Sequence, residues 1–275
     1  FSVDMHDENE GAGDGDPKDV RWQIWKDQET LDTYRSYASL KTQMIPYVQT
    51  AVAEARATGL PVMRHLVIGH AKDPKTYDVG DEYMYGDSLL VAPVVARGLT
   101  SRPVYLPDDA YYDWWTGARV QGHQTIIAAA PLDVVPLYAL EGAIIPMLDA
   151  SIESLFPATV GTIPVTADDM HTRMEVRIFA GNSTSVTIAN GTTFSQSAPA
   201  TSPNVSAPSD DTGAIPLAAS EADTASCSRC AYLDSAAHKL TVVDTVQNVS
   251  VTAGDVTFAV KGASESKRYL FVVRF

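Results

Sequence analysis

The sequence has little cysteine, little positive charge and no long apolar run. Its two cysteines, Cys227 and Cys230, leave no second pair to complete a four-cysteine zinc site. No apolar run reaches the roughly 18 residues that indicate a membrane span. Lys and Arg number 20 against 34 Asp and Glu, and the net charge of −14 argues against a nucleic-acid partner, because too little positive charge is available to neutralise phosphates.

The cysteines stand in the motif CSRC, which leaves several interpretations open. They could form a redox pair, they could bind zinc with His238 as a third ligand, or they could form a local disulfide in a secreted protein. No βαβ pattern surrounds the motif, so a structural disulfide or two idle thiols is the preferred interpretation. Four N-x-S/T sequons and a Ser/Thr/Pro-rich segment favour an extracytoplasmic location, either periplasmic or secreted.

Hydrophobic residues make up 45% of the chain, so a globular fold is expected. Phe1 stands where an initiator methionine would be, and the opening residues offer no signal peptide. They resemble the interior of a domain. We therefore expect the chain to be a piece of a longer one.

The first periodic segment predicts a helix. Asp27 is a suitable N-cap, and apolar residues recur at helical spacing over 31–52. Pro46 is expected to kink the helix, and Gly59 with Pro61 to end it. The run LPVMRHLVI (60–68) follows as a predicted buried strand, of the kind found in a parallel sheet covered on both faces. Helix followed by buried strand is typical of an α/β barrel or a doubly wound sheet.

From about residue 83 the pattern becomes all-β. Short apolar runs such as SLLVAPVV, SRPVYLP and AIIPML are separated by Gly, Pro and Asp without a helical period. MEVRIFAG alternates, and Asn190-Gly191 is a hairpin signal. Residues 193–226 are expected to form a linker or a long surface loop. Strands then return from KLTVVDT to the end of the chain.

One stretch resembles a known family. EYMYGDSLLVAPVVARGLTSRPVYLPDDAYYDWWTG is similar to the junction between the catalytic barrel and the proximal β domain of glycoside hydrolase family 31, which includes α-glucosidases and α-xylosidases. APLDVVPLYALEGAIIPML resembles the next segment of that pattern, and the resemblance extends over about residues 1–192. The sequence departs from the pattern at His65, Leu140, Glu141 and Asn190.

The resemblance implies a multidomain α+β fold. We expect residues 1–87 to be the end of a (β/α)8 TIM barrel and residues 88–156 to be a proximal β domain. Residues 157–275 would be a distal β-sandwich domain with a low-complexity insertion at about 193–226. Because a barrel of this type takes about 250 residues, the chain would hold only its last unit.

The resemblance also implies a retaining α-glycosidase that needs no cofactor. Two aspartates would carry out the reaction, one as nucleophile and one as acid/base, and both would lie upstream of this chain. The catalytic assignment within the chain is therefore none. His6 matches a family histidine that hydrogen-bonds the sugar in the innermost subsite, and Asp4 replaces the Arg of that motif. The expected partners are an α-glycoside and the missing N-terminal part of the same protein.

Other chemistry-bearing residues have plainer interpretations. Asp7, Glu8 and Glu10 are expected in a solvated acidic loop. The stretch DENEGAGDGD could instead bind calcium, but its spacing does not match an EF-hand, so no metal is assigned. Trp22 and Trp25 could stack on sugars, although core packing is preferred.

The tryptophan pair and two aspartates of the β region receive no role in catalysis. Trp114 and Trp115 are expected in the core. Asp113 and Asp133 are assigned to β-domain turns. The competing hypothesis for the whole chain is a non-catalytic carbohydrate-binding or structural β module of a pseudoenzyme.

Overall fold

The computed structural model describes residues 25, 27–108, 110–148, 150, 173–181, 184–188, 193–196, 230–234, 239–244, 250–253, 256–261 and 268–274. These residues form mostly β-strands with few helices. No helix among them is long and apolar enough to cross a membrane. The helical elements are α1 (Gln28–Gln43), α2 (Ile45–Thr58), α3 (Leu66–Gly69) and the 3-10 helix η1 (Pro74–Thr76).

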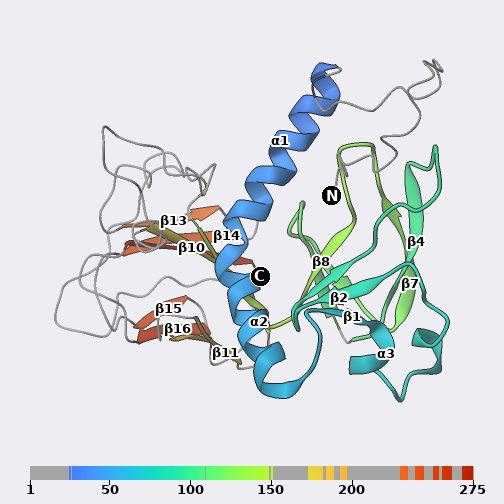
Figure 1. The fold of residues 1–275 in the computed structure, drawn as a ribbon. Helices are drawn as coiled ribbons and strands as arrows, with labels where there is room; N and C mark the ends of the chain where they lie inside the picture. Colours follow the sequence, from blue (N-terminus) through green and yellow to red (C-terminus); the bar gives the residue numbers. More distant parts are fainter. Residues whose placement is uncertain are drawn as a thin grey trace, which may run out of the picture.

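Helices α1 and α2 follow each other almost end to end along the β-rich part of the molecule (Figure 1). The Asp27 side chain accepts a hydrogen bond from the N–H of Thr30 at 2.7 Å, which confirms the predicted cap. The predicted break is also confirmed, because α1 ends at Gln43 and Pro46 lies in the first turn of α2. Gly59 ends α2 with a left-handed φ of 79°.

Nine strands lie among the described residues before 150: six in one sheet, two in a strand pair, and one in a sheet with later strands. They are β1 (Met63–His65), β2 (Tyr83–Tyr85), β3 (Leu89–Val91), β4 (Ser101–Leu106), β5 (Ala110–Asp113), β6 (Arg119–Gln121), β7 (Gln124–Ala129), β8 (Leu137–Leu140) and β9 (Ile144–Leu148). Six of them form an antiparallel sheet in the order β1-β2-β3-β8-β5-β6, and β4 pairs with β7. The predicted all-β character after residue 83 is therefore confirmed.

Strand β1 corrects the expectation for residues 60–68. The strand has three residues instead of spanning the run, and it pairs antiparallel with β2, so the predicted parallel pairing was wrong. The chain then turns into α3, where the Nδ1 of His65 accepts the N–H of Val67 at 3.1 Å. The predicted burial was also wrong for much of the run, because Met63 is 58% and Ile68 is 44% exposed.

The six-stranded sheet is buried on both faces, which explains its unbroken apolar runs. On one face Leu89 and Tyr112 join a core cluster with Met44 and Tyr47 of the helices. On the other face Leu90, Tyr111 and Tyr138 pack in a second cluster with residues of β4 and β7. Because neighbouring residues of a strand point to opposite faces, LLV, AYYD and LYAL are apolar at successive positions.

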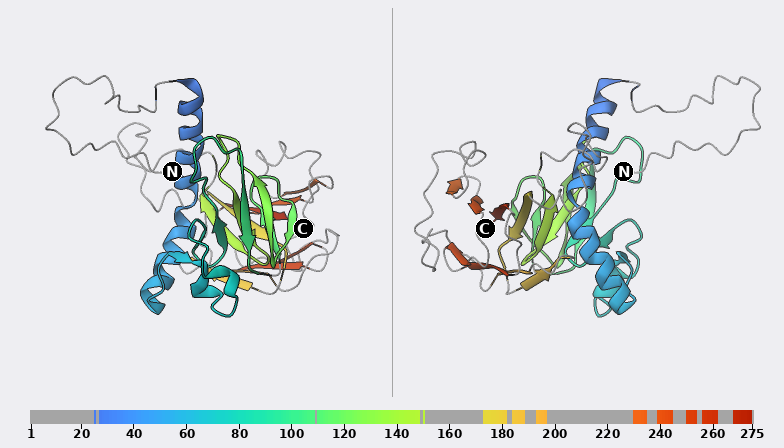
Figure 2. Two further views of the ribbon diagram at one scale, coloured as in Figure 1. Left: turned by 90° about the vertical axis from the view of Figure 1, so that its right-hand side faces the viewer. Right: turned by 60° about the vertical axis from the view of Figure 1, so that its left-hand side comes forward.

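A second region contains the later strands. They are β10 (Arg173–Phe179), β11 (Thr184–Thr187), β12 (Thr193–Gln196), β13 (Cys230–Asp234), β14 (Lys239–Asp244), β15 (Ser250–Ala253), β16 (Val256–Lys261) and β17 (Arg268–Arg274). They form sheets in the orders β13-β14-β17-β10-β9 and β11-β12-β16-β15. Strand β9 precedes the predicted boundary at 156/157, yet it pairs with β10. Figure 2 shows these strands beside the first β region.

The hairpin prediction is confirmed by the register of its strands. β11 and β12 pair antiparallel, with Thr187 opposite Thr193. The turn at Asn190-Gly191 lies outside the described residues. Because β12 occupies residues 193–196, the predicted linker does not begin at 193, which corrects that boundary. The segment TFSQ has only one apolar residue, Phe194, which is too weak a signal for it to be recognised as a strand.

Candidate functional site

The predicted sugar-contacting residue, His6, lies outside the described residues, as do Asp4 and the acidic opening segment. Cys227 and His238 lie outside them as well, so the alternatives for CSRC stay open. Trp25 is described and is 58% exposed, contrary to the core role preferred for it. Most of the polar and aromatic clusters of the described residues lie in residues 27–148 and in β10.

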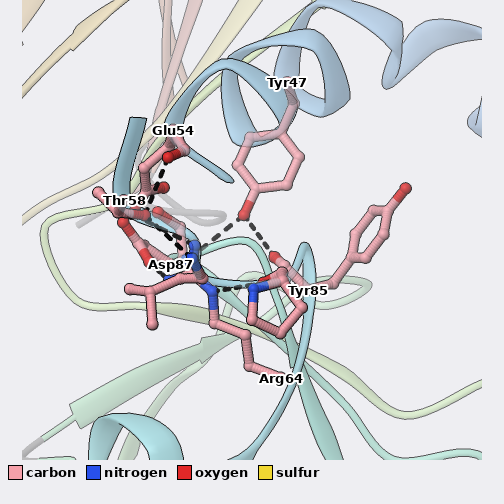
Figure 3. Close-up of polar contacts among 9 residues, drawn as sticks. Tyr47, Glu54, Thr58, Arg64, Tyr85 and Asp87 are labelled. Atoms are coloured by element: carbon pink, nitrogen blue, oxygen red, sulfur yellow. Dashed lines mark hydrogen bonds and ion pairs between the residues drawn. The ribbon is translucent and has the colours of Figure 1, made fainter. Parts of the chain in front are cut away.

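A buried arginine joins α2 to the first two strands. The Nε of Arg64 donates to the carbonyl oxygen of Pro61 at 2.7 Å, and its Nη1 contacts the carboxylate of Asp87. Its Nη2 lies 3.2 Å from the Oε1 of Glu54, as an ion pair without hydrogen-bond geometry. Figure 3 shows these side chains converging beneath Tyr47. Because the guanidinium is 8% exposed, both carboxylates serve to keep a buried charge paired.

Tyr47 fixes the same junction from above. Its hydroxyl donates to the carbonyl oxygen of Tyr85 at 2.5 Å and accepts the N–H of Ser88 at 3.3 Å (Figure 3). Burial raises the pKa of the Tyr47 phenol, so the group keeps its proton and remains a donor. These contacts are structural, and they position the turn at Gly86.

A polar cavity of about 820 Å³ lies beside the loop that follows α3. The Nε2 of His70 lies 3.4 Å from Asp108, and the Tyr111 hydroxyl donates to the same carboxylate at 2.5 Å. Across the cavity, the Tyr105 hydroxyl donates to Asp73. Burial and the Asp73 carboxylate raise the pKa of Tyr105 to about 12, while this hydrogen bond lowers the pKa of Asp73. Both carboxylates are thus engaged as hydrogen-bond acceptors within the fold.

The larger cavity, of about 960 Å³, lies between α1 and the β region, and we call it the α1 groove. Two aromatic residues, Tyr37 and Trp115, stand in its wall with ring centroids 6.0 Å apart in an edge-on arrangement. The Tyr37 hydroxyl donates to the carbonyl oxygen of Asp133 at 3.0 Å and accepts the N–H of Val135 at 2.7 Å. The indole Nε1 of Trp115 donates to the carbonyl oxygen of Val135 at 2.8 Å. One loop therefore holds both aromatic rings.

The tryptophan pair was predicted to be core, which is correct for only one member. Trp114 is 5% exposed, whereas Trp115 is 40% exposed, so the prediction for Trp115 was wrong. Adjacent residues after a strand point in different directions, and that rule could have indicated that one of the two faces outward. Asp113 is the last residue of β5, directly before the turn at 114–116, and its Oδ1 accepts the N–H groups of Trp115 and Thr116.

The chemistry available in the described part of the chain is that of binding and scaffolding. No group of three or more His, Cys, Asp or Glu among the described residues could hold a metal ion. The carboxylates of Glu54, Asp73, Asp87 and Asp108 all have structural partners. The aromatic wall of the α1 groove escaped sequence reasoning because Tyr37 and Trp115 are far apart along the chain.

Part of this β region matches a known protein family. Residues 59–145 match the family model described as the glycosyl hydrolase family 31 C-terminal domain. These residues are similar to the C-terminal domain of glycoside hydrolase family 31. The match begins at Gly59, the residue that ends α2, and includes β1 to β8 and part of β9.

Relatives in family 31 are much longer than this chain. An isomaltosyltransferase from Sporosarcina globispora is 30% identical over 148 residues, which are 53% of this chain and 14% of that protein. Alpha-glucosidase 2 from Bacillus thermoamyloliquefaciens is 32% identical over 131 residues, 48% of this chain and 17% of that protein. A family 31 dextranase structure from Flavobacterium johnsoniae, complexed with glucose, shares the fold with a TM-score of 0.61 at 21% identity, covering 87% of this chain and 34% of that one.

The departures from the family 31 pattern have local roles. Glu141 accepts hydrogen bonds from the Nε and Nη2 of Arg119 at 2.9 and 2.6 Å. His65 caps α3. These residues build local contacts in the β region and its entry loop.

Proposed function

We propose that this chain is the C-terminal part of a retaining α-glycosidase that hydrolyses α-linked di- or oligosaccharides. The observation that carries the proposal is the match of residues 59–145 to the C-terminal domain of a glycosyl hydrolase family. The matched residues of the chain cover 14% and 17% of the two curated relatives quoted above. In the proposed protein, two aspartates upstream of this chain act as nucleophile and acid/base, about 5–5.5 Å apart.

The proposed division of the chain follows the roles of its segments. Residues 1–87 would complete a (β/α)8 barrel, residues 88–156 would form the proximal β domain, and residues 157–275 the distal one. The two consecutive helices α1 and α2 support the first assignment, since a barrel is enclosed by helices. The antiparallel pairing of β1 with β2 argues that the β domain's sheet already includes residues 63–65.

Within this division His6 would hydrogen-bond the sugar in the innermost subsite. An imidazole can donate to or accept from a sugar hydroxyl, and the residue precedes α1 at the position that the family motif gives it. Replacing His6 with Ala in the full-length protein is expected to raise KM for a neutral glycoside. Unchanged kinetics would exclude the contact.

The test of the function begins with the upstream coding sequence, which should contain two motif-embedded aspartates. The full-length product should hydrolyse a nitrophenyl α-glycoside with retention of anomeric configuration. Replacing either aspartate with Ala should abolish turnover, and the 275-residue chain alone should be inactive. An intact upstream frame without both aspartates would instead favour a non-catalytic carbohydrate-binding or structural protein.

Two further proposals concern the binding partners and the cellular location of the protein. The partners would be a neutral α-glycoside and the upstream part of the same polypeptide. An extracytoplasmic location is proposed from the sequons and the Ser/Thr/Pro-rich segment. Fractionation of the native cells would test it, and recovery of the protein only in the cytoplasmic fraction would contradict it.

A further inference from the structure

The α1 groove has the dimensions of a small-molecule site. Its volume of about 960 Å³ lies at the upper end of the range for ligand pockets, which is about 300–1,000 Å³. One wall is the face of α1 from Glu29 to Gln43, and the other is formed by the Trp114-Trp115 turn, the 133–134 loop and strand β10. The space therefore runs along the helix, as an elongated ligand would require.

Only one of the two tryptophans offers its ring to this space. The guanidinium of Arg177 lies 4.5 Å from the centroid of the Trp114 ring, and Phe179 packs against it at 6.0 Å. Trp114 is accordingly buried, and its surface is already used by the fold. Trp115 is 40% exposed and lines the groove, so its indole is the available aromatic surface.

The Trp115 ring is held in place before any ligand binds. Its Nε1–H is donated to Val135, and Tyr37 contacts it edge-on while bonding the same loop with its own hydroxyl. The Trp115 indole nitrogen and the Tyr37 hydroxyl are therefore both hydrogen-bonded to backbone groups. A ligand meets a fixed indole surface instead of a mobile side chain, which lowers the entropic cost of binding.

The remaining lining combines polar and acidic residues with the apolar Leu40, Val134, Phe179 and Val272. Around the aromatic wall it presents carboxylate, hydroxyl and amide groups that can bond to sugar hydroxyls, from Glu29, Asp32, Thr33, Ser36, Gln43 and Asp133. The one arginine of the lining, Arg177, is paired with Glu175 at 2.6 Å. Arg35 lies 3.8 Å from Asp32, so Glu29 and Asp133 supply the uncompensated negative charge of the groove, which disfavours an anionic ligand.

We propose that the α1 groove binds a neutral oligosaccharide, with one sugar ring stacked on Trp115 and its hydroxyls bonded to Asp32 and Asp133. An aromatic surface bordered by hydroxyl-binding carboxylates suits an uncharged polyhydroxylated ring, because such a ring has an apolar face and polar edges. The choice of α-linked glucose units rests on the proposed function, but binding at this groove does not require turnover.

The test is fluorine NMR of the full-length protein labelled with fluorotryptophan. The resonances are assigned from single Trp→Phe variants, and isomaltotriose and maltotriose are titrated separately. We expect saturable shifts of the Trp115 resonance, with no shift for Trp25, the exposed tryptophan that does not line the groove. The proposal would be overturned if neither sugar shifted the Trp115 resonance, or if the Trp115 and Trp25 resonances shifted equally.

Two variant pairs give the measurement its specificity. Trp115→Ala should raise the Kd, followed through the Trp114 resonance, by about tenfold, whereas Trp25→Ala should not. Asp32→Ala should weaken binding, whereas Lys41→Ala, an exposed change on the same helix that does not line the groove, should not. If Asp32→Ala and Trp115→Ala both left the Kd unchanged, the sugar would bind elsewhere and the proposal would fail.

Two sugars that differ only by a carboxylate test the negative charge of the α1 groove. Methyl α-glucoside should shift the Trp115 resonance, and methyl α-glucuronoside, which differs by a carboxylate, should shift it far less. Equal shifts would contradict a site for neutral sugars. Loss of nitrophenyl glycoside hydrolysis with the Trp115 response intact would count against the proposed function alone, and the reverse result would count against the α1 groove alone.

Discussion

The hydroxyl of Tyr47 lies 2.5 Å from the carbonyl oxygen of Tyr85, and this hydrogen bond attaches helix α2 to strand β2. The next residue, Gly86, adopts a left-handed φ of 63° and donates its N–H to the carbonyl oxygen of Val62 at 2.8 Å. Helix, strand and turn therefore meet at one point. The space around Gly86 is the tightest part of this junction.

Replacing Gly86 with Ala should destabilise the fold. The added Cβ would lie 2.4 Å from the Tyr47 hydroxyl oxygen and 2.9 Å from its Cζ, and the backbone would be strained at a positive φ. Overpacking and the left-handed conformation together should lower the free energy of unfolding by about 3 kcal/mol. Urea unfolding of the purified protein measures the change.

Gly80 supplies the matched control for this glycine. A Cβ at Gly80 would meet nothing within 4 Å, and its φ is not in the left-handed region, so Gly80→Ala should change stability by less than about 0.5 kcal/mol. Combining Gly86→Ala with Tyr47→Phe should cost less than the sum of the two changes, because the clash with the hydroxyl is removed. Strict additivity would show that the two residues are not in contact.

Local signals predicted much of this architecture. Asp27, Pro46 and Gly59 act through their own backbone geometry, so the start, break and end of the helices could be predicted from the sequence. The strands after residue 83 were also indicated, because short apolar runs between turn residues reflect burial on both faces of a sheet.

Other features depend on partners that the sequence does not specify. The antiparallel direction of β1 is set by its pairing with β2, some twenty residues later. The outward position of Trp115 is set by a loop that carries both Val135 and the partner of Tyr37. Such contacts between distant segments leave no periodic signal along the chain.

Replacing Arg64 with Ala should cost about 3 kcal/mol of folding free energy, because Glu54 and Asp87 would face each other without the shared cation. Arg35 gives the comparison, since it is 66% exposed and lies 3.8 Å from Asp32. Arg35→Ala should cost about 0.5 kcal/mol or less. Thermal and urea unfolding would distinguish the two, and equal effects would rule out a structural role for the Arg64 network.

Glu82 should make stability depend on pH. Its carboxylate accepts the N–H of Tyr105 at 3.0 Å and lies 3.4 Å from the Nη2 of Arg102. Burial, with a smaller effect from the Asp81 charge, nevertheless raises the pKa of Glu82 from 4.5 to about 7, against the lowering effects of Tyr105 and Arg102. Because the folded state then holds a proton that the unfolded state has released, this contribution to stability is complete below pH 4.5 and is lost as pH rises through 7.

The Glu82→Gln variant tests whether Glu82 makes the protein less stable as the pH rises. It keeps the side-chain shape but cannot titrate, so its free energy of unfolding should fall less than that of the wild type between pH 4.5 and 7. Parallel curves for Glu82→Gln and wild type would show that Glu82 titrates near its ordinary pKa in the folded protein.

Gln196 offers a test of the junction between the two β regions. Its side chain is 2% exposed, and Nε2 donates to the carbonyl oxygens of Gly142 at 2.7 Å and Phe179 at 3.3 Å. Replacing Gln196 with Glu removes these donors at neutral pH and places a buried carboxylate against two carbonyl oxygens, which should cost about 3 kcal/mol.

The loss of folding free energy caused by Gln196→Glu should become smaller at acidic pH. A protonated carboxyl group can again donate a hydrogen bond to one of the two carbonyl oxygens. Ser195→Glu, on the neighbouring position of β12, provides a control in which the added charge is not fully buried and the Gly142 contact remains. Urea unfolding of both variants at neutral and acidic pH would measure the effect. A cost for Gln196→Glu that is independent of pH would mean that the amide's shape, and not its donated hydrogen bonds, holds β12 to the turn at Gly142.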